Sequence, residues 1–281
     1  MTDDFRPGQV REVTAVSNPV IKEIRALALK KNREESGRFL AEGLKLVTDA
    51  LDGGWVVHVV VFAKKMSSNA AVQAVAARAR AQGALILEAS EKVLSTISRR
   101  DNPQMVVGVF GQRWLKPEAI RAQDGDLWIA LDRVRDPGNL GTIIRTADCA
   151  GAKGIILVGE TTDPWSIEAV RATMGSLFHM PVARMGVEAF LQWRKGWPGM
   201  VVGTHLEGAV DYRGVDYSGK PVLLLMGNEQ QGLPPALAES CDRLCLIPMA
   251  GQADSLNLAV ATGVMVFEIR RHALVMKGAS S

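Results

Sequence analysis

The chain has 281 residues, of which 47% are hydrophobic, with a formal net charge of +3 and three cysteines. This length suits one large or two modest globular domains. No apolar run approaches the roughly 20 residues of a membrane helix, and so few cysteines exclude a disulfide framework. The first residues lack a cationic segment followed by an apolar one, so we expect no export, no membrane partner and a cytoplasmic location.

Positive charge is concentrated in the N-terminal part of the chain. Residues 1–112 carry 16 Lys and Arg against 12 Asp and Glu, whereas residues 113–281 carry 17 against 18. The cations are densest between Lys22 and Arg38. Such a run attracts phosphate, although by charge alone a solvated helix face is the simpler interpretation.

Residues 10–112 are predicted to form a small α/β domain. Asn18-Pro19 begins a helical pattern of apolar residues, whereas Phe39-Leu40 is only a short apolar pair. The other expected helices cover 43–51, 69–82 and 90–97, and the expected strands cover 56–62, 85–87 and 105–110. Strands that alternate with helices are typical of an α/β domain.

A polar stretch that contains Pro117 follows, and we place a linker at 113–126. The alternation restarts over 127–275, which we take as the second domain. Its expected strands cover 127–131, 154–158, 182–183, 200–203, 222–225 and 244–247, and its expected helices 139–150, 167–175, 187–193, 234–238 and 256–272. This order predicts a mostly parallel sheet whose ligands bind at the carboxyl ends of the strands.

Three polar stretches follow strands of this second domain, at 132–145, 226–233 and 248–259. In the first, Pro137-Gly138 indicates a turn and Asn139 an N-cap, and Arg145 lies about two turns into the helix. Taken singly, these residues are a cap and a surface ion pair. The glycines lack the dinucleotide-binding spacing, which disfavours an oxidoreductase. Cys241 and Cys245 have too few further ligands nearby for zinc, so we expect no metal.

In order and spacing, the three stretches resemble the signature motifs of the SpoU/TrmH branch of the SPOUT RNA methyltransferases. The resemblance rests on Asn139-Leu140-Gly141 with Arg145 and Gly151, Gly227-Asn228-Glu229 with Gly232-Leu233, and Ile247-Pro248-Met249 with Ser255-Leu256-Asn257 and Ala261. Residues 171–178 and, in the N-terminal part, Ser17-Asn18-Pro19, Arg33 and 39–43 also resemble family sequences. Glu168 departs from the family, which often has a lysine before the 171–178 run.

The resemblance implies a C-terminal trefoil-knotted SPOUT methyltransferase domain with a mostly parallel sheet, and a small N-terminal ribosomal-protein-like α/β domain that binds RNA. It implies methyl transfer from S-adenosylmethionine to a ribose 2′-hydroxyl, which we expect in 23S rRNA. Two alternatives stay open, a tRNA substrate and a non-catalytic RNA-binding relative. The family forms homodimers, and we expect pairing through the first and last helices of the second domain, including 258–267.

The resemblance also assigns roles to individual residues. Arg145 is the activating residue, and we interpret it chiefly as a phosphate and ribose clamp, because arginine stays protonated in proteins. The residues expected to orient the reacting groups are Asn139, Glu229, Ser255 and Asn257. Those expected to contact the cofactor are Gly227, Ile247, Met249, Leu256 and Thr204. Those expected to bind RNA are Lys30, Lys31, Arg33 and Arg171.

Overall fold

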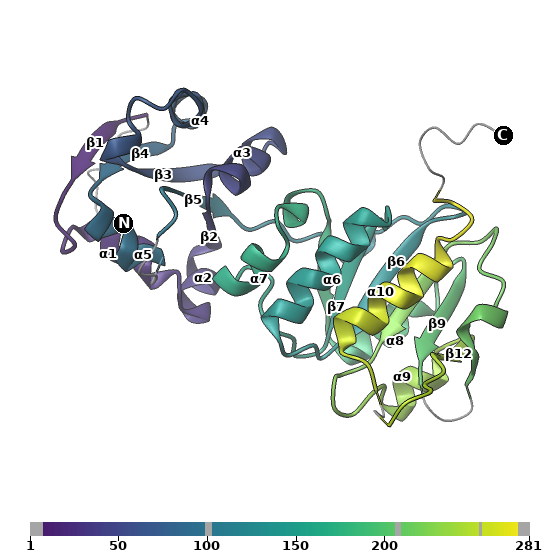
Figure 1. Cartoon of the computed structure of the whole chain (residues 1–281). Coiled ribbons are helices and arrows are strands. Elements are labelled where there is room, and N and C mark those ends of the chain that lie inside the picture. The colour runs from purple at the N-terminus through teal and green to yellow at the C-terminus, as the bar shows by residue number, and fades with distance from the viewer. Residues whose placement is uncertain (1–7, 99–102, 206–208, 253–254, 275–281) are drawn as a thin grey trace. The chain divides into compact units, whose positions relative to one another are not determined.

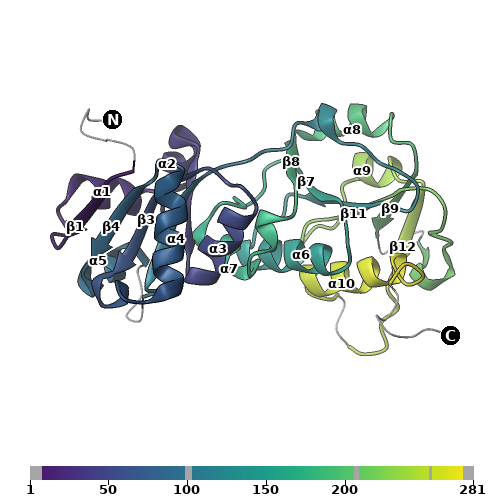
Figure 2. The ribbon, with the colours of Figure 1, turned by 90° about the horizontal axis from the view of Figure 1, so that it is seen from above.

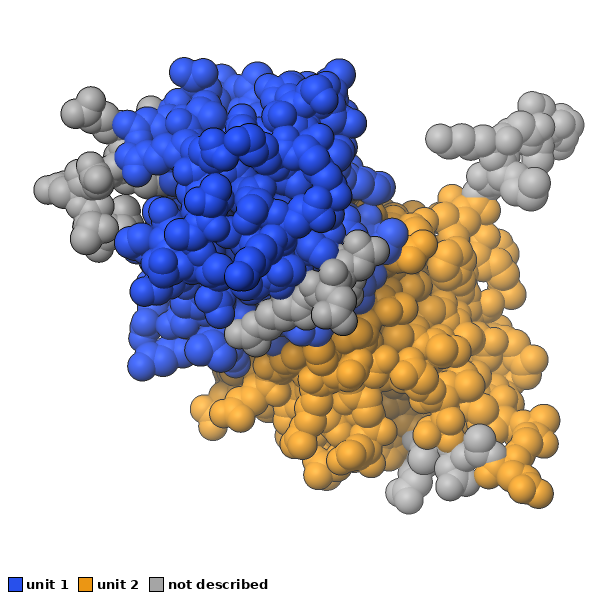
Figure 3. All heavy atoms as spheres, turned by 60° about the vertical axis from the view of Figure 1, so that its left-hand side comes forward, with its two compact units in different colours: residues 1–112, 163–178 blue, residues 113–162, 179–281 orange. Residues whose placement is uncertain are grey.

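Two separate β-sheets organise the chain (Figures 1 and 2). The computed structural model describes residues 8–98, 103–205, 209–252 and 255–274. One unit comprises the described residues up to 112 together with 163–178, and the other comprises 113–162 and the described residues from 179 onward (Figure 3). Among the described residues, no helix is both long and apolar enough to cross a membrane.

The N-terminal unit contains a five-stranded mixed sheet in the order β1-β4-β3-β5-β2. Strands β1, β4 and β3 are parallel, and β5 is antiparallel to both of its neighbours. Helices α3 and α4 cover one face and α1 and α5 the other (Figure 1). The strands are β1 (Val10–Val13), β2 (Arg38–Glu42), β3 (Val57–Ala63), β4 (Leu85–Ala89) and β5 (Val106–Gly111). The helices are α1 (Pro19–Ala26), α2 (Lys30–Ser36), α3 (Leu44–Asp52), α4 (Ala70–Ala81) and α5 (Glu91–Ser98), with a 3₁₀ turn at Lys64–Met66.

The first helix begins where the sequence predicts. The Asn18 side chain accepts a hydrogen bond from the Val20 amide at 2.9 Å, and Pro19 occupies the first helical position. Residues 38–42, expected only as an apolar pair, form a strand because β5 supplies an antiparallel partner about 70 residues later. Strand β1 was likewise not predicted, since three of its four residues are exposed and it lies at an edge.

The second unit contains a seven-stranded sheet in the order β10-β12-β9-β11-β6-β7-β8, and every pairing in it is parallel. Helices α6 and α10 cover one face, and α8 and α9 cover the other (Figure 2). The strands are β6 (Leu127–Asp132), β7 (Gly154–Val158), β8 (Val182–Met185), β9 (Met200–Thr204), β10 (Val210–Asp211), β11 (Val222–Met226) and β12 (Arg243–Leu246). The helices are α6 (Pro137–Cys149), α8 (Val187–Arg194), α9 (Pro235–Glu239) and α10 (Leu258–Ile269), with 3₁₀ turns at Pro117–Ala119 and Tyr212–Gly214.

The start of α6 differs from the prediction. Asn139 was expected to cap this helix, but Asp136 is the N-cap, and its side chain accepts from the Asn139 amide at 2.6 Å. Pro137 is the first helical residue instead of part of a preceding turn, because its fixed φ suits that position. The side chain of Asn139 is therefore released from capping and is available for other contacts.

Residues 163–178 connect β7 to β8 along the chain but pack within the N-terminal unit. They include α7 (Ile167–Ala172) and a 3₁₀ turn at Ser176–Phe178. Trp165 is 1% exposed, and the centroid of its ring lies 4.9 Å from that of Phe39 and 5.8 Å from that of Trp55. The Trp55 indole donates to the Phe178 carbonyl at 3.1 Å. The predicted boundaries leave this segment in the second domain, and the aromatic packing explains why it clusters with the first.

Replacing Trp165 with alanine should weaken the N-terminal unit selectively. Loss of so large a buried ring should lower the free energy of unfolding of that unit by about 3–5 kcal/mol. Hydrogen exchange should become faster in β3 and stay unchanged in β11. Faster exchange in β11 alone would show that the segment stabilises the other unit.

Candidate active site

Loops from several strands meet at one edge of the seven-stranded sheet. Because all strands are parallel, the segments that follow β6, β9, β11 and β12 all leave from the carboxyl edge. The loop after β6 leads into α6, the loop after β11 into α9, and the loop after β12 into α10. The three motif stretches of the sequence are thus brought to the same edge.

A chain of three side chains joins these loops. Asn257 caps α10 through its Oδ1, which accepts from the Ala259 amide at 2.9 Å. Its Nδ2 donates to Asn139 Oδ1 at 2.9 Å, and Asn139 Nδ2 donates to Glu229 Oε1 at 3.4 Å. The first turn of α6, the start of α10 and the loop after β11 are therefore linked by side-chain amides. Three of the predicted orienting residues are brought together.

The loop after β11 is closed by its own backbone. The amide of Asn228 donates to the Gly232 carbonyl at 3.1 Å, and the Gly232 amide donates back at 3.0 Å. A Cβ on Gly227 would lie 2.3 Å from the Gly232 carbonyl carbon and 2.4 Å from the Leu233 nitrogen. Gly227 was expected to contact the cofactor, and the space that a side chain would take there is filled by the protein's own loop.

Asn228 is a structural centre of this loop that the sequence-based assignment left without a role. It is 7% exposed, and its Oδ1 accepts from the amides of Gln230 and Gln231 at 2.9 and 3.3 Å. Its Nδ2 donates to the Arg133 carbonyl at 2.9 Å and to Glu229 Oε2 at 3.4 Å. Its place inside the second motif was the signal that could have identified it.

Asp132 and Arg133, at the end of β6, form a second fixed point. Asp132 is fully buried and receives hydrogen bonds from Arg133 Nε at 3.1 and 2.9 Å. Hydrogen bonding to Asp132 raises the pKa of Arg133 above its ordinary value, so this guanidinium stays charged. Arg133 has a left-handed φ of 46° and also donates to Gln231 Oε1 at 3.1 Å. The pair therefore ties the end of β6 to the loop after β11.

The remaining predicted active-site residues are open at this edge. Arg145 is exposed on α6, and its guanidinium forms no hydrogen bond or ion pair with any other described residue. Ser255 is exposed, and the Thr204 hydroxyl lies 3.7 Å from the sulfur of Met226. Met249 and Leu256 are 41% and 36% exposed, and Ile247 is half-buried. Residues 253–254 of this loop lie outside the described residues.

The four predicted RNA-binding residues fall into two groups. Lys30 and Lys31 are exposed on α2, where each forms an ion pair of 3.8 Å with a glutamate one turn later. Arg33 is buried and bound to Asp163. Arg171 is bound to the buried Glu42 and donates to the Ser98 carbonyl at 3.3 Å. The guanidinium groups of these two arginines are thus paired within the protein, Arg33 buried and Arg171 partly exposed, whereas the two lysines are largely exposed.

The described residues contain no group of three His, Cys, Asp or Glu side chains that could hold a metal ion. Burial raises the pKa of Cys241 to about 12, so this thiol stays protonated. A cavity of about 470 Å³ lies beside the C-terminal end of α10, lined by residues such as Gly125 and Gly219 that precede β6 and β11. It is therefore at the opposite, amino edge of the sheet from the motif loops.

Comparison with known proteins identifies both parts of the chain. Residues 126–267 match the SpoU rRNA Methylase family, and residues 18–108 match the MRM3-like substrate binding domain.

Three of the similar proteins match most of the chain. The 23S rRNA (guanosine(2553)-2'-O)-methyltransferase RlmP of Bacillus subtilis is 31% identical over 93% of this chain and 100% of its own length. The 23S rRNA (uridine(2479)-2'-O)-methyltransferase of Streptomyces viridochromogenes is 32% identical over 87% and 86%. An AdoMet-bound rRNA methyltransferase from Sinorhizobium meliloti has a similar crystal structure, with 60% identity and a TM-score of 0.90 over 95% of this chain and 99% of its own. The chain therefore belongs to the SpoU rRNA methylase family, the S-adenosylmethionine-dependent RNA methyltransferases that its motifs resemble.

Proposed function

We propose that this enzyme methylates a ribose 2′-hydroxyl of 23S rRNA, in the cytoplasm. The observation that carries the proposal is the chain of hydrogen bonds from Asn257 through Asn139 to Glu229, beside an exposed Arg145 on the same helix as Asn139. Two relatives that match both units of the chain are named for 2′-O-methylation of 23S rRNA. That whole-length similarity favours rRNA over the tRNA alternative.

The residues at the carboxyl edge fit S-adenosylmethionine. Met249 and Leu256 are both exposed in the loop that leads to α10. They offer apolar surface to an adenine or a methionine chain, while the loop after β11 presents backbone groups. Gly227, Ile247 and Thr204 would complete this surface. The bound group supplies an electrophilic methyl on a sulfonium, so the protein need not activate it.

The protein's task is then to place the ribose hydroxyl and to ease loss of its proton. Arg145 carries a charge at an exposed position that no other described residue pairs, which suits a clamp on a phosphate and its ribose. Asn139 and Asn257 hold the Glu229 carboxylate in a fixed direction, and Ser255 adds a hydroxyl to the same edge. A set of groups fixed before the substrate arrives loses little energy to reorganisation during the reaction.

We also propose that α10 is covered by a second copy of the chain. One side of the helix is buried, including Met265 and Val266, yet Val260 and Phe267 on its other side are 53% and 48% exposed. A helix that is apolar all round is normally buried on all sides. A second α10 matches this surface in chemistry and length, and the pairing would place a partner beside Arg145 on the adjacent helix. The trefoil knot stays a prediction.

Ribose methylation tests the substrate and Arg145 together. We expect 23S rRNA from a strain that lacks the gene to lose one 2′-O-methyl group, detected by mass mapping, and the wild-type gene to restore it. Unchanged 23S rRNA together with loss of a tRNA methyl group would establish the alternative substrate.

Arg145→Ala should lower turnover of the purified enzyme on the order of a hundredfold, the scale that follows removal of a transition-state interaction, while S-adenosylmethionine affinity stays near wild type.

Gly227→Val should abolish cofactor binding measured by calorimetry without added metal. The valine side chain would overlap the backbone at Gly232, so the loop after β11 could not close. Gly232→Asn is the matched control, because this glycine has a left-handed φ of 63° that asparagine tolerates and no neighbour within 4 Å of an added Cβ. Equal affinity in the Gly227→Val and wild-type proteins would disprove the assignment of this loop to the cofactor.

Phe267→Glu should convert a dimer into a monomer in light scattering. A carboxylate in an apolar interface would lose its hydration without gaining a partner. Phe267→Leu keeps the surface apolar and should remain dimeric. A wild-type protein that is monomeric at micromolar concentration and fully active would contradict the proposed pairing.

A further inference from the structure

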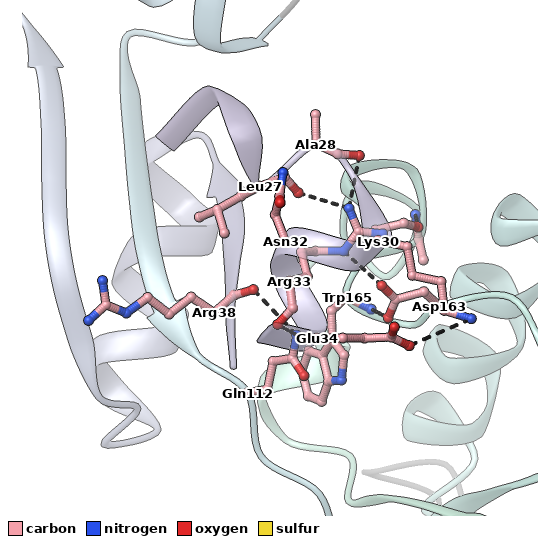
Figure 4. A network of polar contacts seen from close by, with 12 residues as sticks. Leu27, Ala28, Lys30, Asn32, Arg33, Glu34, Arg38, Gln112, Asp163 and Trp165 are labelled. Atoms are coloured by element: carbon pink, nitrogen blue, oxygen red, sulfur yellow. Dashed lines mark hydrogen bonds and ion pairs between the residues drawn. The ribbon is translucent and has the colours of Figure 1, made fainter. Parts of the chain in front are cut away.

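Helix α2 is held in place from inside the N-terminal unit by one buried arginine. Arg33 is 4% exposed, and its Nε donates to Asp163 Oδ2 at 2.7 Å (Figure 4). Its Nη1 donates to the carbonyls of Leu27 and Ala28 at 2.8 and 3.0 Å. These carbonyls lie at the C-terminal end of α1, where backbone acceptors lack helical partners. A single side chain thus closes the turn between α1 and α2.

The start of α2 has no capping side chain of its own. Leu29 occupies the N-cap position and makes no side-chain cap hydrogen bond. A second side chain from α2 reaches back in the same way as Arg33, because Asn32 Nδ2 donates to the Ala26 carbonyl at 2.7 Å. The direction in which α2 leaves the turn therefore depends on polar side chains that point inward, and Arg33 supplies three of their hydrogen bonds.

Two residues from distant parts of the chain also hold α2, and both lie where the chain passes between the units. Gln112 is the last residue of the N-terminal unit before the chain leaves it, and Asp163 is the first after it returns. Gln112 Nε2 donates to the Arg33 carbonyl at 3.1 Å, and its amide donates to the Gly37 carbonyl at 2.7 Å. Helix α2 is therefore attached to both of these passages.

Asp163 is itself fixed on either side. Its Oδ1 accepts from the amide of Trp165, whose ring is buried among the aromatic side chains. The preceding residue, Thr162, belongs to the other unit and donates its amide to the Val134 carbonyl at 2.7 Å, just beyond β6. Asp163, whose carboxylate binds Arg33, thus directly follows a residue that is hydrogen-bonded to the segment after β6.

The outer surface of α2 carries the two exposed lysines. The side chains of Lys30 and Lys31 are 58% and 82% exposed, and each forms an ion pair with a glutamate at 3.8 Å. Exposed pairs at this distance contribute little energy, so a phosphate can readily compete for the ammonium groups. One short helix therefore carries a buried, paired arginine on its inner side and two exposed lysines on its outer side.

We propose that Arg33 is a positioning residue for RNA. It does not contact RNA but holds α2 in the orientation in which Lys30 and Lys31 bind phosphates. The proposal rests on the proposed RNA-binding role of the N-terminal unit. It differs from a general structural role because it predicts that a buried side chain changes the number of phosphates bound, and that it does so only through the lysines.

A double-mutant cycle on RNA affinity against salt concentration tests this. Lys30→Gln with Lys31→Gln should lower the salt slope by roughly 0.7–0.9 for each phosphate that the variant no longer binds. Arg33→Met should lower the slope as well, and should have no further effect when both lysines are already replaced. S-adenosylmethionine affinity, which does not involve RNA, should stay near wild type. Arg78→Met is the matched control, since Arg78 forms an exposed ion pair with Asp52 on α3, and it should keep the wild-type slope.

Two further variants keep the test decisive if Arg33→Met folds poorly. Arg33→Met combined with Asp163→Asn removes both buried charges, so neither is left unpaired. Arg33→Lys keeps the cation but lacks the planar fork of donors, and should give an intermediate slope. Each must show the wild-type circular dichroism. If the variant with both Lys30→Gln and Lys31→Gln keeps the wild-type slope, the RNA-binding role of α2 fails. The positioning role is overturned if that variant lowers the slope while the folded Arg33 variants do not. It is also overturned if the effects of the lysine and Arg33 substitutions simply add.

Discussion

The uniform direction of the strands in the seven-stranded sheet is the constraint on which the active site depends. It sends the loops after β6, β11 and β12 to one edge, although the loop after β6 is far from the other two along the chain. An inner strand of opposite direction would place its loop at the other edge and break the contact between Asn257 and Asn139. The chemistry therefore follows from topology first and from side chains second.

At that edge, the oxygen and the nitrogen of each asparagine side-chain amide bind different partners. Asn257 uses its oxygen to begin α10 and its nitrogen to hold Asn139. Asn139 is available for this contact because Asp136 caps α6 in its place. Asn228 uses its oxygen and its nitrogen to fix the loop after β11. The groups at the site are thus oriented by backbone geometry before any ligand binds, as electrostatic preorganisation requires.

Features that depend on a few neighbouring residues could be predicted from the sequence. The strand-end loops, the cap at Asn18 and the helix after Asn257 are local patterns, and the motif resemblance identified the family. Features that depend on distant partners could not. Strand β2 exists because β5 pairs with it, and residues 163–178 join the N-terminal unit because Trp165 packs among its aromatic rings. The closure of Gly227 against Gly232 likewise required the folded loop.

The basic run from Lys22 to Arg38 shows why charge alone does not reveal which cations are exposed. In sequence, Lys30, Lys31 and Arg33 are equivalent cations separated by at most three positions. In the fold, the two lysines are exposed, whereas Arg33 turns inward and meets an aspartate 130 residues later. Burial makes that pairing obligatory, because an unpaired charge is costly inside a protein. The exposed positive charge of α2 is therefore smaller than the sequence suggests.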